Sequence, residues 1–137
     1  MLHNLGALAQ IGRDYPKARR LYQESLDIEQ QLGNRAGVAT SLHNLGMLAE
    51  IGGDYSEARR LYQESLDIAQ QLGDRAGVAL SLAQFALLEE REGNVGRALE
   101  LARVAEGIFN ELGSPNAAEA RRVRERLEGS QENEETG

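Results

Sequence analysis

The sequence predicts an all-α stack of helix pairs, and three observations favour this fold class. First, the chain repeats itself: when residues 1–40 are compared with 41–80 position by position, 31 are identical. Second, apolar residues recur at i, i+3, i+4 and i+7, which is the spacing of one helix face. Third, aromatic residues make up only 4% of the chain, so Leu, Ala, Ile and Val must form the core. A fixed period of this length is typical of stacked-repeat proteins.

The first repeat predicts two helices, from about residue 1 to 11 and from about 15 to 32. Asp14 is placed to cap the second helix, because its carboxylate accepts the free amides of the first turn. Gly33 follows the last apolar residue and is typical of a left-handed C-terminal cap. Asn34 then begins the next helix, and so short a connection makes neighbouring helices antiparallel.

The second repeat predicts helices over 35–51 and 55–72, and the third repeat follows the same pattern more loosely. A glycine inside a helix costs about 1 kcal/mol relative to alanine, yet one stands at positions 6 and 46. We expect a packing reason: without a side chain, Gly46 would let the backbones approach closely opposite Ala58. In the third repeat Ala86 replaces this glycine, and Ala102 replaces a tyrosine of the earlier copies.

A last helix is predicted from Asn116 to about Leu127, with Ser114 as its cap. Its apolar stripe is thin and its other faces are charged, as a terminal capping helix requires. The sequence therefore predicts the following organisation: a first repeat at 1–33, a second at 34–73, a third at 74–113, a capping helix at 114–128 and a disordered acidic tail at 129–137. The first repeat lacks a counterpart to the start of the second, which predicts an N-terminally truncated repeat from a larger protein.

Composition excludes several classes of function. The formal net charge of −7 argues against general nucleic-acid binding, which needs a basic surface. No apolar run approaches the ~20 residues of a membrane span, and no signal-peptide pattern opens the chain. The absence of cysteine excludes disulfides, thiolate metal sites and cysteine nucleophiles. We expect a cytoplasmic protein.

The repeat resembles the tetratricopeptide repeat (TPR) family, in which small and aromatic residues recur at fixed spacings. The matching positions in the second copy are Leu42, Leu45, Gly46, Ala49, Gly53, Asp54, Tyr55, Ala58, Tyr62 and Ser65. The period here is forty residues rather than about 34. The forty-residue form is similar to Partner-of-Inscuteable-type polarity adaptors, kinesin light chains and the sensor arrays of bacterial signal-transduction NTPases. The resemblance implies a right-handed superhelical solenoid of three helix-turn-helix repeats plus a capping helix.

The resemblance also implies that the first helix of each pair lines a concave groove that binds peptides or proteins. Carried over by position, the groove residues are His3, Asn4, Ala7, Gln10, His43, Asn44, Met47, Glu50, Ala83, Gln84, Leu87 and Glu90. Asn4, Asn44 and Gln84 would form an amide ladder. A primary amide both donates and accepts hydrogen bonds, so such a ladder suits the backbone of an extended peptide. The simpler alternative is that these are exposed polar residues without a ligand.

Other candidate sites have little support. His3 and His43 are about one repeat apart, which is too far for a shared metal ion without further ligands. Glu50 and Glu90 favour a ligand with basic or amide character. The arginine pairs at 19–20 and 59–60 are most simply solvated faces that pair with Glu24 and Glu64, with a binding stripe as the alternative.

We therefore predict a non-enzymatic interaction scaffold that belongs to a signalling or regulatory protein. Neither a nucleophile–base pair nor a phosphate-binding loop is present in the sequence, and no cofactor or metal is expected. The expected partner is a protein or an extended peptide, not nucleic acid or membrane. The alternative is a structural module that self-associates end to end through its exposed N-terminal repeat face.

Overall fold

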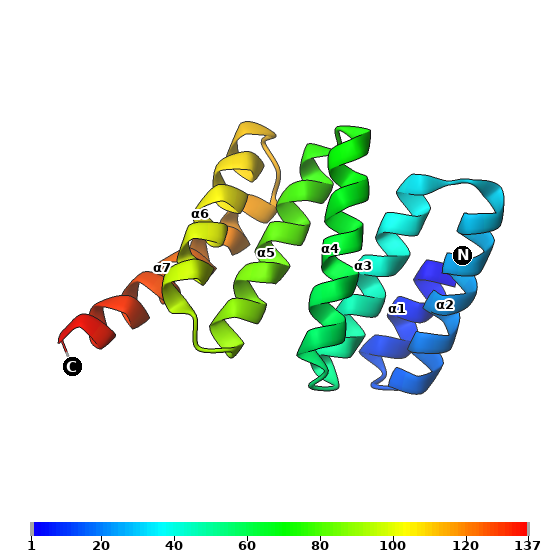
Figure 1. Cartoon of the computed structure of the whole chain (residues 1–137), viewed down its shortest axis with the longest axis horizontal. Coiled ribbons are helices and arrows are strands. Elements are labelled where there is room, and N and C mark those ends of the chain that lie inside the picture. Colours follow the sequence, from blue (N-terminus) through cyan, green and yellow to red (C-terminus); the bar gives the residue numbers. More distant parts are fainter. Residues whose placement is uncertain (1, 137) are drawn as a thin grey trace. The chain divides into compact units, whose positions relative to one another are not determined.

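The computed structural model describes residues 2–136, and over that range it forms seven helices and no strand (Figure 1). The side chains of His3 and of residues 134–136 lie outside the described part. The helices are α1 (Leu2–Ile11), α2 (Tyr15–Leu32), α3 (Arg35–Ile51), α4 (Tyr55–Leu72), α5 (Arg75–Arg91), α6 (Val95–Glu111) and α7 (Asn116–Thr136). The pairs α1–α2, α3–α4 and α5–α6, followed by α7, confirm the predicted all-α helical repeat.

The chain divides into two compact units, Met1–Leu72 and Gly73–Gly137. Within the first unit, α2 packs against both α1 and α3, and α3 packs against α4. Within the second unit, α6 packs against both α5 and α7. Each unit is considered by itself below.

The helix ends follow the sequence prediction. Gly33 ends α2 with a left-handed φ of 69°, and Gly73 and Gly113 have similar values of 68° and 64°. Side-chain oxygens accept hydrogen bonds from backbone amides of the first turn, as expected of N-terminal caps. These caps are Asp14 with Lys17 N at 3.3 Å, Asn34 with Gly37 N at 3.1 Å, Asp54 with Glu57 N at 3.1 Å, Asp74 with Gly77 N at 3.0 Å and Ser114 with Asn116 N at 3.1 Å.

A tyrosine ring packs on the mid-helix glycine in both copies of the repeat in the first unit. A Cβ placed on Gly46 would lie 2.6 Å from Cε1 of Tyr62, and one on Gly6 would lie 2.4 Å from Cε1 of Tyr22. The atoms nearest to the Cβ position on Gly46 belong to Tyr62 and not to Ala58, which was expected to oppose Gly46. Ala58 is fully buried, but the side chain that requires the glycine is the aromatic one, one helical turn further along α4.

The hydroxyl of each ring reaches back to the first helix of its own pair. Tyr62 Oη donates to Glu50 Oε1 at 2.9 Å, and Tyr22 Oη donates to Gln10 Oε1 at 3.0 Å. A buried phenol needs such a partner, because an unpaired buried polar group costs about 1–3 kcal/mol. Glycine, tyrosine and acceptor therefore form one contact, spread over two helices, in each of the first two repeats.

The third repeat lacks this contact. Ala86 and Ala102 stand at the glycine and tyrosine positions, and both are buried. In the second unit a core cluster forms instead around Phe109 of α6, with Ala79, Ala105 and Ala120. The third repeat therefore carries a Cβ at position 86 only where the tyrosine ring, with which that Cβ would clash, is also missing.

Helix α7 continues to Thr136, where the sequence predicted a disordered tail from residue 129. Glu and Gln are good helix formers, and the segment contains no proline. Gly129, Ser130 and Gln131 are half-buried, and Ser130 Oγ donates to Arg126 O at 3.2 Å. The continued helix therefore follows from local propensity together with partial burial.

The glycine–tyrosine contact predicts a sign reversal in a double-mutant cycle. We expect Gly46→Ala to lower the free energy of unfolding by about 1–3 kcal/mol in the natural protein, because the new methyl overpacks a ring that is fully buried. In a Tyr62→Ala background the same change should instead raise it by about 0.5–1 kcal/mol, since only the helix propensity of alanine remains.

Urea unfolding of the four proteins, followed by far-UV circular dichroism, measures both effects. An effect of Gly46→Ala that is equal in the two backgrounds would show that the ring is not the reason for the glycine.

Candidate functional site

The predicted groove residues of the first unit lie on α1 and α3. On α1, Asn4 and Ala7 are exposed, whereas the side chain of His3 lies outside the described residues. On α3, His43, Asn44 and Met47 are half-buried. Asn44 takes part in an interaction within the chain.

Two predicted groove residues are part of the packing instead. Glu50 is only 6% exposed and accepts the hydroxyl of Tyr62, so its carboxylate is not a free ligand for a basic partner. Gln10 is half-buried and accepts the hydroxyl of Tyr22. The sequence did not distinguish Gln10 and Glu50 from the groove face. Each lies one helical turn after another predicted groove residue, Ala7 or Met47, and therefore falls on the same side of its helix in the periodic pattern.

His43 is also involved in this contact. Its ring lies 5.6 Å from that of Tyr62 between centroids, with the two planes tilted by 49°. Burial lowers the pKa of His43 below its ordinary value of 6.5, because a buried site disfavours the charged imidazolium. Among the described residues, no group of three or more His, Asp or Glu side chains is placed to hold a metal ion.

The predicted groove residues of the second unit line a crevice between α5 and α7. Ala83, Gln84 and Leu87 form its α5 wall, and Ala120 and Val123 belong to the opposite wall on α7. The volume of the crevice is about 240 Å³. Three of the residues that the sequence assigned to a groove therefore share one hollow.

The floor of this crevice comes from α6 and consists of Ala102, Ala105 and Phe109. Periodicity did not predict these residues, although Ala102 replaces a tyrosine of the earlier copies. Glu90, the fourth predicted residue on α5, is tied to α7 instead, because Arg126 Nη2 lies 2.5 Å from its Oε1. This ion pair spans the same two helices as the crevice.

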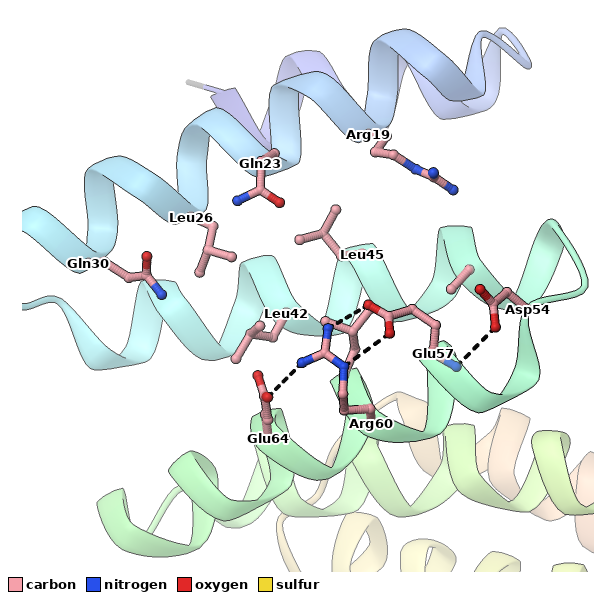
Figure 2. A pocket seen from close by; sticks show the side chains of 12 residues that line it. Arg19, Gln23, Leu26, Gln30, Leu42, Leu45, Asp54, Glu57, Arg60 and Glu64 are labelled. Atoms are coloured by element: carbon pink, nitrogen blue, oxygen red, sulfur yellow. Dashed lines mark hydrogen bonds and ion pairs between the residues drawn. The ribbon is translucent and has the colours of Figure 1, made fainter.

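A second crevice lies in the first unit, on the side formed by the second helices of the two pairs. Its floor is α3, with Leu42, Leu45 and Ala49, and its volume is about 370 Å³ (Figure 2). Polar side chains of α2 and α4 form the walls. These are Arg19, Gln23 and Gln30 on α2 and Glu57, Arg60 and Glu64 on α4, with Asp54 before it.

The charges of this second crevice are largely satisfied within the chain. Arg60 lies between Glu57 and Glu64, with Nη2–Oε1 and Nη1–Oε1 distances of 2.5 Å and 2.8 Å, as the dashed lines in Figure 2 mark. The pairing with Glu64 confirms the sequence interpretation of that arginine. The hydrogen bond from Arg60 is the main reason that the pKa of Glu57 lies below its usual value, and the charge of Arg19 contributes. The walls therefore carry both signs and select no single kind of ligand.

The comparisons with known proteins agree on the fold. The sequence profile described as "Tetratricopeptide repeat" matches residues 1–71 and again 53–111. The crystal structure of the apo form of RapI is similar with a TM-score of 0.87 and 12% identity, over 96% of this chain and 48% of that one. BtubC (BKLC) from P. vanneervenii is similar with a TM-score of 0.68 and 19% identity, over 96% of this chain and 63% of that one.

At these identities, the two structures show a shared fold alone. The chain spans about half the length of the first and under two thirds of the second. The comparison with curated proteins gave no match. No described helix is long and apolar enough to cross a membrane.

The lowered pKa of His43 predicts that acid destabilises the fold. The unfolded chain takes up the proton at the ordinary pKa near 6.5, before the folded chain does, so stability is complete above that pH and is lost as the pH falls below it. We expect the free energy of unfolding to fall more between about pH 7.5 and pH 5.5 in the natural protein than in a His43→Gln variant. Urea unfolding at both pH values measures this, and an equal loss in the two proteins would contradict it.

Proposed function

The chain belongs to the tetratricopeptide repeat family, whose repeats generally mediate protein–protein interaction, and we propose that its first-helix faces bind an extended peptide segment of a partner protein. The observation that carries this proposal is the crevice between α5 and α7, at which Gln84 places an amide beside Leu87. An amide next to an apolar hollow is the combination that holds a peptide backbone and one of its side chains together.

The amides on the first helices supply the backbone contacts in this proposal. Asn4, Asn44 and Gln84 occupy the same position in successive repeats, so each repeat offers one amide to a peptide. Each amide can donate to a carbonyl and accept from an N–H of the peptide. Contacts of this kind bind a backbone without strong preference for its sequence, and they suit an adaptor in a signalling or regulatory assembly.

Removing two of these amides tests the proposal. We expect Asn44→Ala/Gln84→Ala to weaken binding of the partner by about five- to 150-fold, because each lost hydrogen bond is worth about 0.5–1.5 kcal/mol. The partner is first isolated with the natural chain as bait, and its affinity is then measured by isothermal titration calorimetry.

The matched control is Gln70→Ala/Asn110→Ala. It removes one exposed amide from the second helix of a pair in each unit, and it should leave the affinity unchanged. Unchanged binding by the Asn44→Ala/Gln84→Ala variant, with an unaltered circular dichroism spectrum, would contradict the peptide groove.

A second candidate function is self-association through the outer face of α1. Leu5, Leu8 and Ile11 are 43%, 64% and 80% exposed. The equivalent Leu45 and Leu48 of α3 are only 8% and 3% exposed, in a helix that packs against both α2 and α4. An apolar helix face of this kind marks an interaction site, and two copies that meet through it would form a symmetric pair.

This second candidate predicts a concentration-dependent mass. Multi-angle light scattering should show a shift from monomer towards dimer as the protein concentration rises, and Leu8→Glu should abolish the shift because it buries an unpaired carboxylate at the contact. A monomeric mass across a wide range of concentration would exclude the dimer.

A further inference from the structure

The first two repeats fill one particular space with a ring from their own chain. In the second repeat, Tyr62 extends from α4 onto Gly46 of α3 and ends at Glu50. The ring is fully buried and also contacts the imidazole of His43. Tyr22 occupies the equivalent space in the first repeat, against Gly6.

The third repeat leaves the corresponding space open. Ala102 stands where the other repeats have the ring, and Ala86 stands where they have the glycine that receives it. One methyl group on α5 replaces much less volume than the ring removed from α6. Both alanines line the crevice of about 240 Å³ between α5 and α7, so the hollow lies where the sequence deletes the tyrosine.

The size of the crevice limits its occupant. Sites for small molecules and cofactors usually measure about 300–1,000 Å³, and this hollow is smaller. It is open to the surface along the α5 wall, where Ala83, Gln84 and Leu87 are half-buried. These dimensions suit one large side chain that enters from the surface.

The lining determines the chemistry of that side chain. The floor is Ala102, Ala105 and Phe109, and the α7 wall includes Ala120 and Val123. Small aliphatic walls with one phenyl ring favour an apolar, flat group, since aromatic pairs gain about 0.5–1.5 kcal/mol beyond the area they bury. The carboxylate equivalent to Glu50 is Glu90, and Arg126 engages it. The polar side chains of the lining are Gln84, Asn116 and Glu119, so a ring with or without a hydroxyl fits the hollow.

We propose that the crevice between α5 and α7 binds an aromatic side chain of the partner peptide, in the space that Tyr22 and Tyr62 fill in the other repeats. This rests on the proposed function and names the residue type that anchors the peptide. Gln84, at the edge of the same hollow, is placed to bind the peptide backbone beside the anchor. In this proposal the third repeat is the part of the binding surface that selects the peptide sequence, because it requires an aromatic residue.

Two short peptides that differ by one ring test the proposal on the full chain. The probes are acetyl-Ala-Phe-Ala-amide and acetyl-Ala-Ala-Ala-amide, each titrated into ¹⁵N-labelled protein and followed by amide chemical shifts. The Phe probe should give saturable shifts at Ala83, Ala102 and Val123, and the Ala probe should give none there. Absence of saturable shifts with the Phe probe, or equal shifts with both probes, would overturn the proposal.

Variants that fill the hollow extend the test. Ala86→Gly/Ala102→Tyr restores the ring and its glycine from the first two repeats and should weaken binding of the Phe probe at least tenfold. Val123→Phe fills the same space from α7, so the test remains valid if the double variant does not fold. Val104→Tyr is the matched control, because it adds a ring at an exposed position of α6, and its binding should equal that of the natural chain.

The same variants separate this proposal from the groove proposal. Undiminished binding of the Phe probe to either folded, filled variant would overturn the aromatic anchor. That result would not decide whether the peptide groove exists, which the Asn44→Ala/Gln84→Ala variant tests separately. Weaker binding in both filled variants, with an unaffected Val104→Tyr control, supports the anchor independently of those amides.

Discussion

The contact between a tyrosine ring and a glycine inside the neighbouring helix determines how the helices of the first two repeats pack. Tyr62 is fully buried against Gly46, and a ring placed so deeply fixes the spacing of the two helices because cores are closely packed. The same contact explains why a residue unfavourable to helices stands in the middle of α3. It also recruits Glu50 as an acceptor and His43 as a neighbouring ring.

This contact decides which side chains remain available for binding. Glu50 and Gln10 accept the tyrosine hydroxyls, and Glu50 is also buried, so its carboxylate is not presented at the surface. The surface left on the first helices is therefore narrower and less charged than helix periodicity indicates. The predicted positions outside this contact are Asn4, Ala7, Asn44 and Met47 in the first unit and Ala83, Gln84 and Leu87 in the second.

Duplication with divergence gives the two units different surfaces from one pattern. The first unit keeps both rings and has a crevice among the polar side chains of α2 and α4 (Figure 2). The second unit replaces ring and glycine by Ala102 and Ala86 and has an apolar hollow between α5 and α7. Paired replacement of this kind keeps the helix pair intact, because neither change leaves a clash, while it alters what the surface can hold.

The sequence by itself determined the helices, their caps and their repeat, because periodicity, Asp14, Asn34 and Gly33 act within a few residues of the chain. It did not determine that the ring of Tyr62 covers Gly46, or that Glu50 faces inward. Residues one helical turn apart look equivalent in a periodic pattern, and only the packing of a second helix separates them. Tertiary structure likewise decided that the missing ring at Ala102 leaves a hollow, because relaxation of α5 and α7 around it could have closed the space. Partial burial of Gly129 to Gln131 also belongs to tertiary structure, since contact with the rest of the second unit adds to a weak local preference for helix.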